Sequence, residues 1–187
     1  MSVGAEVHLT GDEIGIEHAD GLYGYAVTLT RNYAEAEDLV QETFLRALGA
    51  MHRLRENSNV KGWLFTILRN IWLNELRKRR NGPNMVGMED NDGRALDLPG
   101  KFKDSHEILV DHEDAQIVRS AIAELPVEHR EVILLREFEE MSYQQIATIL
   151  NCPVGTVMSR LGRARARLRF ILEDLTVPFR PDPERSA

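Results

Sequence analysis

A stretch rich in glycine, proline and acidic residues, NGPNMVGMEDNDGRALDLPG at 81–100, interrupts a chain whose apolar residues otherwise repeat at helical spacing. The stretch has no apolar periodicity, which is typical of a linker. No alternating strand pattern occurs on either side of it. We therefore predict an all-α fold of two small helical domains joined by a flexible acidic linker. The predicted segments are a tail at 1–16, a first domain at 17–82, the linker at 83–110, a second domain at 111–175 and a tail at 176–187.

The charges are unevenly distributed, although the net charge of −7 is unusual for a DNA-binding protein. Residues 17–82 carry ten basic and eight acidic residues, whereas 83–112 carry three basic and seven acidic residues. All five basic residues after Arg136 up to position 175 lie between 160 and 169, with no acidic residue among them. Local fields decide where a polyanion docks, so the total charge does not exclude nucleic acid as a partner.

Several classes of protein are disfavoured by what the sequence lacks. The single cysteine, Cys152, excludes an intramolecular disulfide and suits a reducing cytosol. The N-terminus has no basic residue and no apolar segment, and no apolar run approaches the roughly 20 residues that span a bilayer. We therefore expect a cytoplasmic protein without membrane insertion. With no phosphate-cradling glycine loop, no HExxH and scattered histidines, we predict no enzyme, no catalytic residues, no metal site and no cofactor.

Two predicted helices, Ser142–Leu150 and Thr156–Leu172, are separated by a short turn, which is the spacing of a helix-turn-helix. The first begins with a capping box at 142–145, and Asn151 can take the left-handed conformation that ends it. On the second, apolar residues are predicted to face inward: Val157, Leu161, Ala164 and Leu168. Polar residues are predicted to face outward: Thr156, Ser159, Arg160, Arg163 and Arg167. A recognition helix uses such residues for base edges and phosphates.

A solvated charged face is the alternative for this helix, but five arginines without a balancing acid repel one another unless an anion is near. In the first domain, a predicted helix from Val60 to Arg80 carries aromatic, amide and basic residues: Trp63, Trp72, Asn70, Asn74 and Arg77–Arg80. These groups suit single-stranded DNA, because rings stack on bases and cations hold phosphates. A buried role for both tryptophans and a solvated basic helix end are equally compatible with the sequence.

A third surface lies on the predicted helix around Ala36–Ala47, where Asp38, Gln41 and Glu42 share one face. Taken alone, this pattern favours ordinary solvated surface over a binding site.

Three runs of sequence resemble the extracytoplasmic-function sigma factors of bacterial RNA polymerase. AEAEDLVQETFLRAL at 34–48 resembles the segment that grips the polymerase core. NVKGWLFTILRNIWLNELRKRR at 59–80 is similar to the promoter-melting and −10-reading segment of sigma region 2. ELPVEHREVILLREFEEMSYQQIATILNCPVGTVMSRLGRARARLR at 124–169 resembles the −35-reading helix-turn-helix of sigma region 4. The runs occur in family order with an acidic linker between them, and together they are highly specific.

The resemblance implies an alternative sigma factor that binds core polymerase, reads −35 and −10 promoter elements and aids promoter opening. It implies docking of the first domain on the clamp helices of the largest subunit through Asp38, Leu39, Gln41 and Glu42. The loop from about His52 to Lys61 is expected to capture a base flipped from the non-template strand. The expected −10 DNA residues are Lys61, Trp63, Arg69, Asn70, Asn74 and Arg77.

The second domain is expected to sit on the polymerase flap and to insert its recognition helix at the −35 element. The expected −35 DNA residues are Thr156, Met158, Ser159, Arg160, Arg163 and Arg167. Partners are therefore core RNA polymerase, double- and single-stranded promoter DNA and an anti-sigma factor. Met158 stands where the family usually has Lys or Arg, and Gly162 where a bulkier residue is common, so the −35 sequence cannot be copied from relatives.

Two other functions are compatible with part of the pattern. A stand-alone helix-turn-helix regulator would need a ligand pocket or dimerisation helix in the N-terminal half, against the resemblance at 34–48. A sigma-like decoy that sequesters an anti-sigma factor should lose basic residues from both reading helices. This chain keeps them: Arg77, Lys78, Arg79, Arg80, Arg160 and Arg163.

Overall fold

The computed structural model of the chain describes residues 11–54, 58–81 and 108–176, and within these residues it contains helices and no strand. The first bundle consists of α1 (Gly11–Thr30), α2 (Tyr33–Ala50), a 3-10 turn (Met51–Arg53) and α3 (Val60–Asn81). The second consists of α4 (Ile108–Ala123), α5 (Val127–Ile133), a π-helical turn (Leu134–Phe138), α6 (Tyr143–Leu150) and α7 (Val154–Thr176). The predicted all-α class and the division into two helical domains are confirmed.

Two helices begin before the predicted domain limits, α1 at Gly11 rather than 17 and α4 at Ile108 rather than 111. Both helices begin before the first residues of the apolar periodicity from which the limits were inferred. Most of the predicted linker and most of both predicted tails lie outside the described residues.

The first bundle forms around apolar residues that repeat along α1, α2 and α3. The Asn32 side chain caps α2 by accepting a hydrogen bond from the Glu35 N–H at 3.2 Å. The ring of Tyr25 in α1 lies 5.3 Å from that of Phe65 in α3, centroid to centroid. The core of the bundle is completed by buried residues from all three helices: Leu22, Ala26, Leu29, Ala36, Leu39, Leu64 and Leu68.

The helix-turn-helix of the second bundle is built by local signals that the sequence predicts. Ser142 and Gln145 form the reciprocal capping box of α6, with both hydrogen bonds present at 3.2 and 2.7 Å. Asn151 ends α6 in the left-handed conformation, at φ 49° and ψ 52°. α7 begins at Val154, two residues before the predicted Thr156, because the Pro153 carbonyl already accepts hydrogen bonds from Thr156 N–H at 2.9 Å and Val157 N–H at 3.3 Å.

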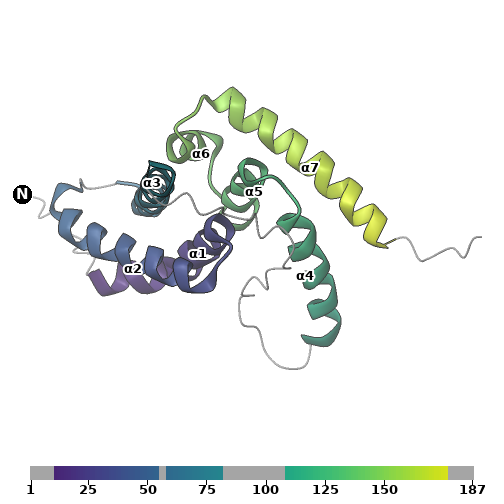
Figure 1. Ribbon diagram of the computed structural model, residues 1–187, viewed down its shortest axis with the longest axis horizontal. Coiled ribbons are helices and arrows are strands. Elements are labelled where there is room, and N and C mark those ends of the chain that lie inside the picture. The colour runs from purple at the N-terminus through teal and green to yellow at the C-terminus, as the bar shows by residue number, and fades with distance from the viewer. Residues whose placement is uncertain (1–10, 55–57, 82–107, 177–187) are drawn as a thin grey trace, which may run out of the picture.

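The two bundles pack directly against each other, which the sequence analysis did not predict. Figure 1 shows α5 and α6 between the first bundle and α7, with α1 against α5 and α3 against α6. Buried residues of both bundles form one continuous core. This contact determines which of the predicted DNA-binding residues are accessible.

Candidate nucleic-acid interface

The recognition helix α7 has one buried face and one exposed face. Val157, Leu161 and Ala164 are buried against α5 and α6, and Leu168 is half-buried, so the predicted inward face is confirmed. Of the residues predicted to face outward, Ser159, Arg163 and Arg167 are exposed and Thr156 is half-buried; Met158, an expected −35 contact, is also exposed. Packing of the inward face on the preceding helices fixes the orientation of the outward face.

Arg160 is less exposed than predicted, because an acidic residue of α5 lies beside it. Its side chain is 23% exposed, and its Nη2 atom lies 3.6 Å from Glu128 Oε2. Arg165 is paired too, through Nη2 at 2.6 Å from Glu137 Oε1 in the π-helical turn. The hydrogen bond to Glu137, acting against slight burial, raises the pKa of Arg165. Acidic residues of earlier elements therefore balance the charge of two of the five arginines. The prediction of an arginine run without a balancing acid was wrong.

The arginines in the middle of α7 offer cationic surface. Arg163 is exposed, and the Arg167 guanidinium lies over the ring of Phe170 with 5.4 Å between its Cζ atom and the ring centroid. Met158 is 55% exposed and has no charge to offer. The outward face of α7 thus combines a small polar N-terminal part with a basic middle part.

The proposed polymerase-binding face on α2 is open to solvent at its polar positions. Asp38 and Gln41 are exposed. Glu42 pairs with Arg46 one turn later, with 2.7 Å between Oε1 and Nε, and both side chains remain about half exposed. Leu39 is 6% exposed and belongs to the core. Only the three polar residues of this set can therefore touch a partner in this conformation, and Leu39 holds the helix in place.

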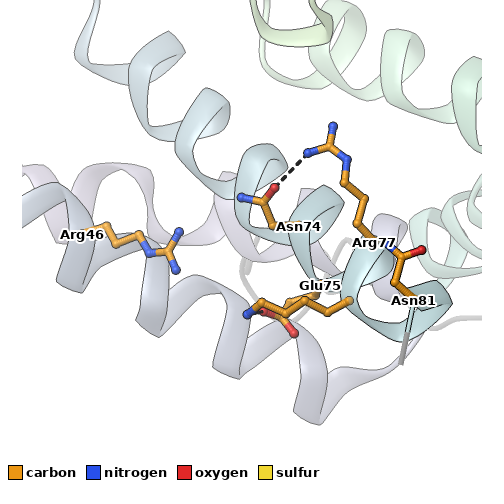
Figure 2. A pocket seen from close by; sticks show the side chains of 6 residues that line it. Arg46, Asn74, Glu75, Arg77 and Asn81 are labelled. Carbon is orange, nitrogen blue, oxygen red and sulfur yellow. Dashed lines mark hydrogen bonds and ion pairs between the residues drawn. The ribbon is translucent and has the colours of Figure 1, made fainter. Parts of the chain in front are cut away.

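A shallow hollow lies between α2 and the C-terminal half of α3, and Figure 2 shows its lining from both helices. Asn74 and Arg77 meet there, with Arg77 Nη1 donating to Asn74 Oδ1 at 2.9 Å. The hydrogen bond from Lys78, with smaller contributions from Arg79 and Arg46, lowers the pKa of Glu75. Cations thus outnumber the single acid among the lining residues: Arg46, Asn74, Glu75, Arg77, Lys78 and Asn81.

Arg46 is a member of this hollow that the sequence analysis missed. It lies on α2, 28 positions before Asn74, so no spacing along α3 could indicate it. The only local signal is its position four residues after Glu42, which the structure shows as an ion pair. Asn70, one turn before Asn74, is exposed on the same helix.

The remaining predicted −10 residues, Lys61, Trp63 and Arg69, do not lie on open surface. Lys61 Nζ is 2.8 Å from Glu139 Oε2 and donates to the Glu139 backbone carbonyl at 2.9 Å. Trp63 is half-buried and packs against the core. Arg69 Nε is 2.7 Å from Glu131 Oε1, and its side chain is 14% exposed. Both carboxylates belong to the second bundle. Residues 55–57 of the predicted base-capturing loop lie outside the described residues.

Glu131 on α5 is a buried acid held by two donors of the first bundle. Its Oε1 atom accepts from the Tyr25 hydroxyl at 2.8 Å as well as from Arg69. Burial, together with the charge of Glu131, raises the pKa of Tyr25 well above its usual range, so the phenol stays protonated and donates. Burial is the largest single influence on the pKa of Arg69 and would lower it, but the hydrogen bond to Glu131 and the negative charge of Glu131 together outweigh burial and raise that pKa.

Metal binding and membrane crossing find no support in the described part of the chain. Residues 11–54, 58–81 and 108–176 contain no cluster of three or more His, Cys, Asp or Glu that could hold a metal ion. Among these same residues, no helix is both long and apolar enough to cross a bilayer.

Comparison with known proteins places both bundles in one family. The family model for Sigma-70 region 2 matches residues 16–82, and that for Sigma-70 region 4 matches 115–168. The chain is 38% identical over 162 residues to the ECF RNA polymerase sigma factor EcfG of Rhodopseudomonas palustris, covering 86% of this chain and 84% of that protein. It is 37% identical over 163 residues to the ECF RNA polymerase sigma factor SigL of Mycobacterium tuberculosis, covering 86% and 88% respectively.

Among solved structures, the chain is similar to the sigma factor RpoE of Bartonella quintana in complex with the anti-sigma factor NepR. The TM-score is 0.65 at 32% identity, over 87% of this chain and 96% of that chain. The likeness therefore extends over both bundles.

Proposed function

This chain belongs to the ECF sigma factors of bacterial RNA polymerase, and from that membership we propose which residues bind the polymerase and which read a promoter. The protein is an alternative sigma factor that directs RNA polymerase to promoters. Sigma factors regulate transcription initiation and are not enzymes. The first predicted domain, 17–82, acts on the polymerase core and the −10 element, and the second, 111–175, acts on the −35 element. The segment 83–110 is the predicted linker between them.

The polymerase-binding surface is the polar face of α2. Asp38, Gln41 and Glu42 are accessible there, and two carboxylates suit a basic patch on the clamp helices of the largest subunit. Leu39 contributes by anchoring α2 in the core. Glu37 is also exposed on α2 but is not a member of this set, so it supplies a control position.

The −10 surface is the exposed side of α3 with the hollow beside it. Asn70, Asn74 and Arg77 supply amides for base edges and a cation for phosphate, and Arg46 adds a second cation from α2. Arg46→Ala should weaken binding of a −10 single strand and reduce its salt dependence by about one counterion. Lys61, Trp63 and Arg69, the other expected −10 residues, lie nearer the start of α3, where the ion pairs with Glu139 and Glu131 and packing on the core partly cover them.

The −35 surface is the outward face of α7, and its geometry is the single observation that best supports promoter reading. One side of the helix is buried on α5 and α6, which leaves a polar and basic row free to enter a major groove. We assign base reading to the middle of the row, at Arg160 and Arg163, and phosphate contact to Arg167. The row is completed by Thr156, Met158 and Ser159. This bundle docks on the polymerase flap.

An anti-sigma factor is the proposed regulator. The RpoE chain to which this protein is 32% identical was crystallised with the anti-sigma factor NepR, and the likeness covers 87% of this chain. A protein partner of that class would compete with the polymerase for the first bundle.

Run-off transcription with core polymerase on genomic promoter fragments tests the proposal. The full-length protein should produce discrete transcripts that core polymerase alone does not. The double variant Asp38→Arg/Glu42→Arg should produce none, while Glu37→Arg should behave as wild type. Transcripts from the double variant would show that α2 does not carry the polymerase contact.

A further inference from the structure

The recognition helix α7 has a second basic flank, made by Arg165 and Arg169, that lies outside the proposed −35 surface. We propose that this second flank faces the phosphates on the wall of the major groove opposite the one that Arg167 contacts, and that Glu137 withholds Arg165 from them. Glu137 is then a residue that determines how firmly the protein holds −35 DNA. The inference rests on the proposed function, because it takes the entry of α7 into the groove as given.

The position of the second flank follows from the spacing of residues along α7. Leu161 and Ala164 are buried, so the side of the helix opposite them points away from the protein. Ala166 lies on that side and is exposed. Successive residues of an α-helix are about 100° apart, which places Arg165 and Arg167 at equal angles on the two sides of Ala166.

The side chains that separate the two flanks are small. Ser159, Gly162 and Ala166 are exposed along the middle of the outward face. A Cβ atom at Gly162 would have no neighbour within 4 Å. Small side chains let the helix approach the base edges closely, in a groove about 12 Å wide. The guanidinium groups of Arg165 and Arg167 then extend sideways, one toward each sugar-phosphate wall.

Each flank carries two exposed arginines four residues apart. Arg163 and Arg167 form the first flank, and Arg165 and Arg169 form the second. Residues four apart lie one above the other on a helix, so each pair runs along the groove. Both strands carry the same phosphate charge, which makes the second flank as suitable for phosphate contacts as the first.

The two flanks differ because an acid holds one of the arginines of the second flank. Glu137, in the π-helical turn, accepts at Oε1 from Arg165 Nε at 3.1 Å and from Arg165 Nη2 at 2.6 Å. These two nitrogens form an edge of the guanidinium that can hold a phosphate in a bidentate contact. The Arg167 guanidinium lies over the ring of Phe170 instead, and its positive charge is not neutralised there.

The direction of the effect of Glu137 on DNA binding follows from its charge. The side chains of Arg165 and Glu137 are 50% and 45% exposed, and an ion pair so exposed contributes little to the stability of the fold. The carboxylate cancels the attraction of Arg165 for a phosphate, whereas a neutral glutamine would leave Arg165 fully charged. A phosphate contact strengthens binding to every sequence alike, so Glu137 affects affinity and leaves sequence preference unchanged.

The test is a salt titration of holoenzyme binding to a −35 duplex from a promoter found by run-off transcription. A mismatched duplex of the same length is measured beside it. Glu137→Gln should bind both duplexes more tightly and steepen the slope of log affinity against log salt by about 0.9. Between 200 and 50 mM salt, its advantage over wild type should therefore grow about 3.5-fold. Arg169→Gln should make the slope shallower by about the same amount.

Two controls separate a withheld contact from a general effect of charge. Glu140→Gln removes the same charge from an exposed residue three positions later and should leave the slope at the wild-type value. Arg165→Gln alone should change the slope little, because Glu137 already neutralises Arg165. When Arg165→Gln is added to Glu137→Gln, the gain of the single variant should disappear. The melting temperature of each variant, followed by circular dichroism, measures whether the fold is intact.

A wild-type slope for Glu137→Gln would overturn the inference. Weaker binding by this variant together with a lower melting temperature would also overturn it, since the pair would then brace the fold. A gain that persists after Arg165→Gln is added would show that Arg165 is not the withheld contact. If wild type prefers the matched duplex and Glu137→Gln behaves like it, only the second flank is refuted; a wild type without that preference refutes the −35 assignment as well.

Discussion

Replacing Arg69 with methionine removes one of the cations that lie between the bundles and keeps an unbranched side chain. Of the two donors that hold Glu131 Oε1, only the Tyr25 hydroxyl would remain. Glu131 and Arg69 are 3% and 14% exposed, so the values for buried pairs apply. Removing one partner of a buried ion pair costs about 3–5 kcal/mol. By contrast, Tyr25→Phe removes one hydrogen bond to a charged acceptor and should cost about 1.5–3 kcal/mol.

The loss of stability caused by Arg69→Met has an upper limit. Separation of the bundles rehydrates Glu131, so the destabilisation by Arg69→Met cannot exceed the free energy that keeps the closed form together. We therefore expect Arg69→Met to open the molecule before it unfolds either bundle. Its helical content should stay at the wild-type level. The distance between spin labels at two exposed positions, Ala34→Cys on α2 and Ala166→Cys on α7, should lengthen.

Urea unfolding followed by circular dichroism measures the change in the free energy of unfolding. The distance between the two spin labels measures separation of the bundles. Arg77→Met is the control, because Arg77 is exposed and bonds to Asn74 of the same helix, and a substitution there should change stability by less than about 0.5 kcal/mol. The effects of Arg69→Met and Tyr25→Phe on stability should be non-additive in a double-mutant cycle, because both residues donate to the same Glu131 oxygen. If Arg69→Met and Tyr25→Phe match wild type in stability and in distance, Glu131 is not held between the bundles.

Three further outcomes are expected. The double variant Asp38→Arg/Glu42→Arg should lose co-elution with core polymerase and keep its helical content, since both positions are accessible; a stable holoenzyme would contradict this assignment. In holoenzyme binding to matched and mismatched −35 duplexes, Arg163→Ala should cost about 1–3 kcal/mol at one base pair. Arg167→Ala should weaken all duplexes alike and lower the salt slope by about one, and identical behaviour of the two variants would refute the division. Because the pKa of Tyr25 is raised on folding, its contribution to stability is present below pH about 10 and lost as pH rises above it. The difference in unfolding free energy between wild type and Tyr25→Phe should therefore shrink at alkaline pH, and a constant difference would count against a buried phenol.

Local signals predicted much of the helix-turn-helix. The capping box at Ser142 and the left-handed Asn151 are short-range features, so residues a few positions apart determine them. The inward face of α7 follows from apolar spacing in the same way. The family resemblance supplied the functional assignment of these elements, which spacing alone could not.

The contacts between elements were not predictable in this way. Tyr25 and Glu131 are 106 residues apart in sequence, and Arg69 and Glu131 are 62 apart, so no periodicity relates them. For the same reason, the sequence suggested an unbalanced arginine run on α7, although Glu128 and Glu137 reach two of its members from earlier elements. Arg69 was assigned to DNA from its place on α3, without any indication that an acid covers it.

Permanganate footprinting of a promoter bound by the reconstituted holoenzyme tests the central claim most directly. The claim is that α7 recognises the −35 element and that α3 acts in opening the −10 region. With wild-type protein, thymines near the −10 element should become reactive. Arg163→Ala/Arg167→Ala should lose promoter binding and reactivity together. Asn74→Ala/Arg77→Ala should keep the −35 contact, measured as protection from nuclease, and lose the reactive thymines. Reactive thymines at wild-type level in both double variants would contradict the account.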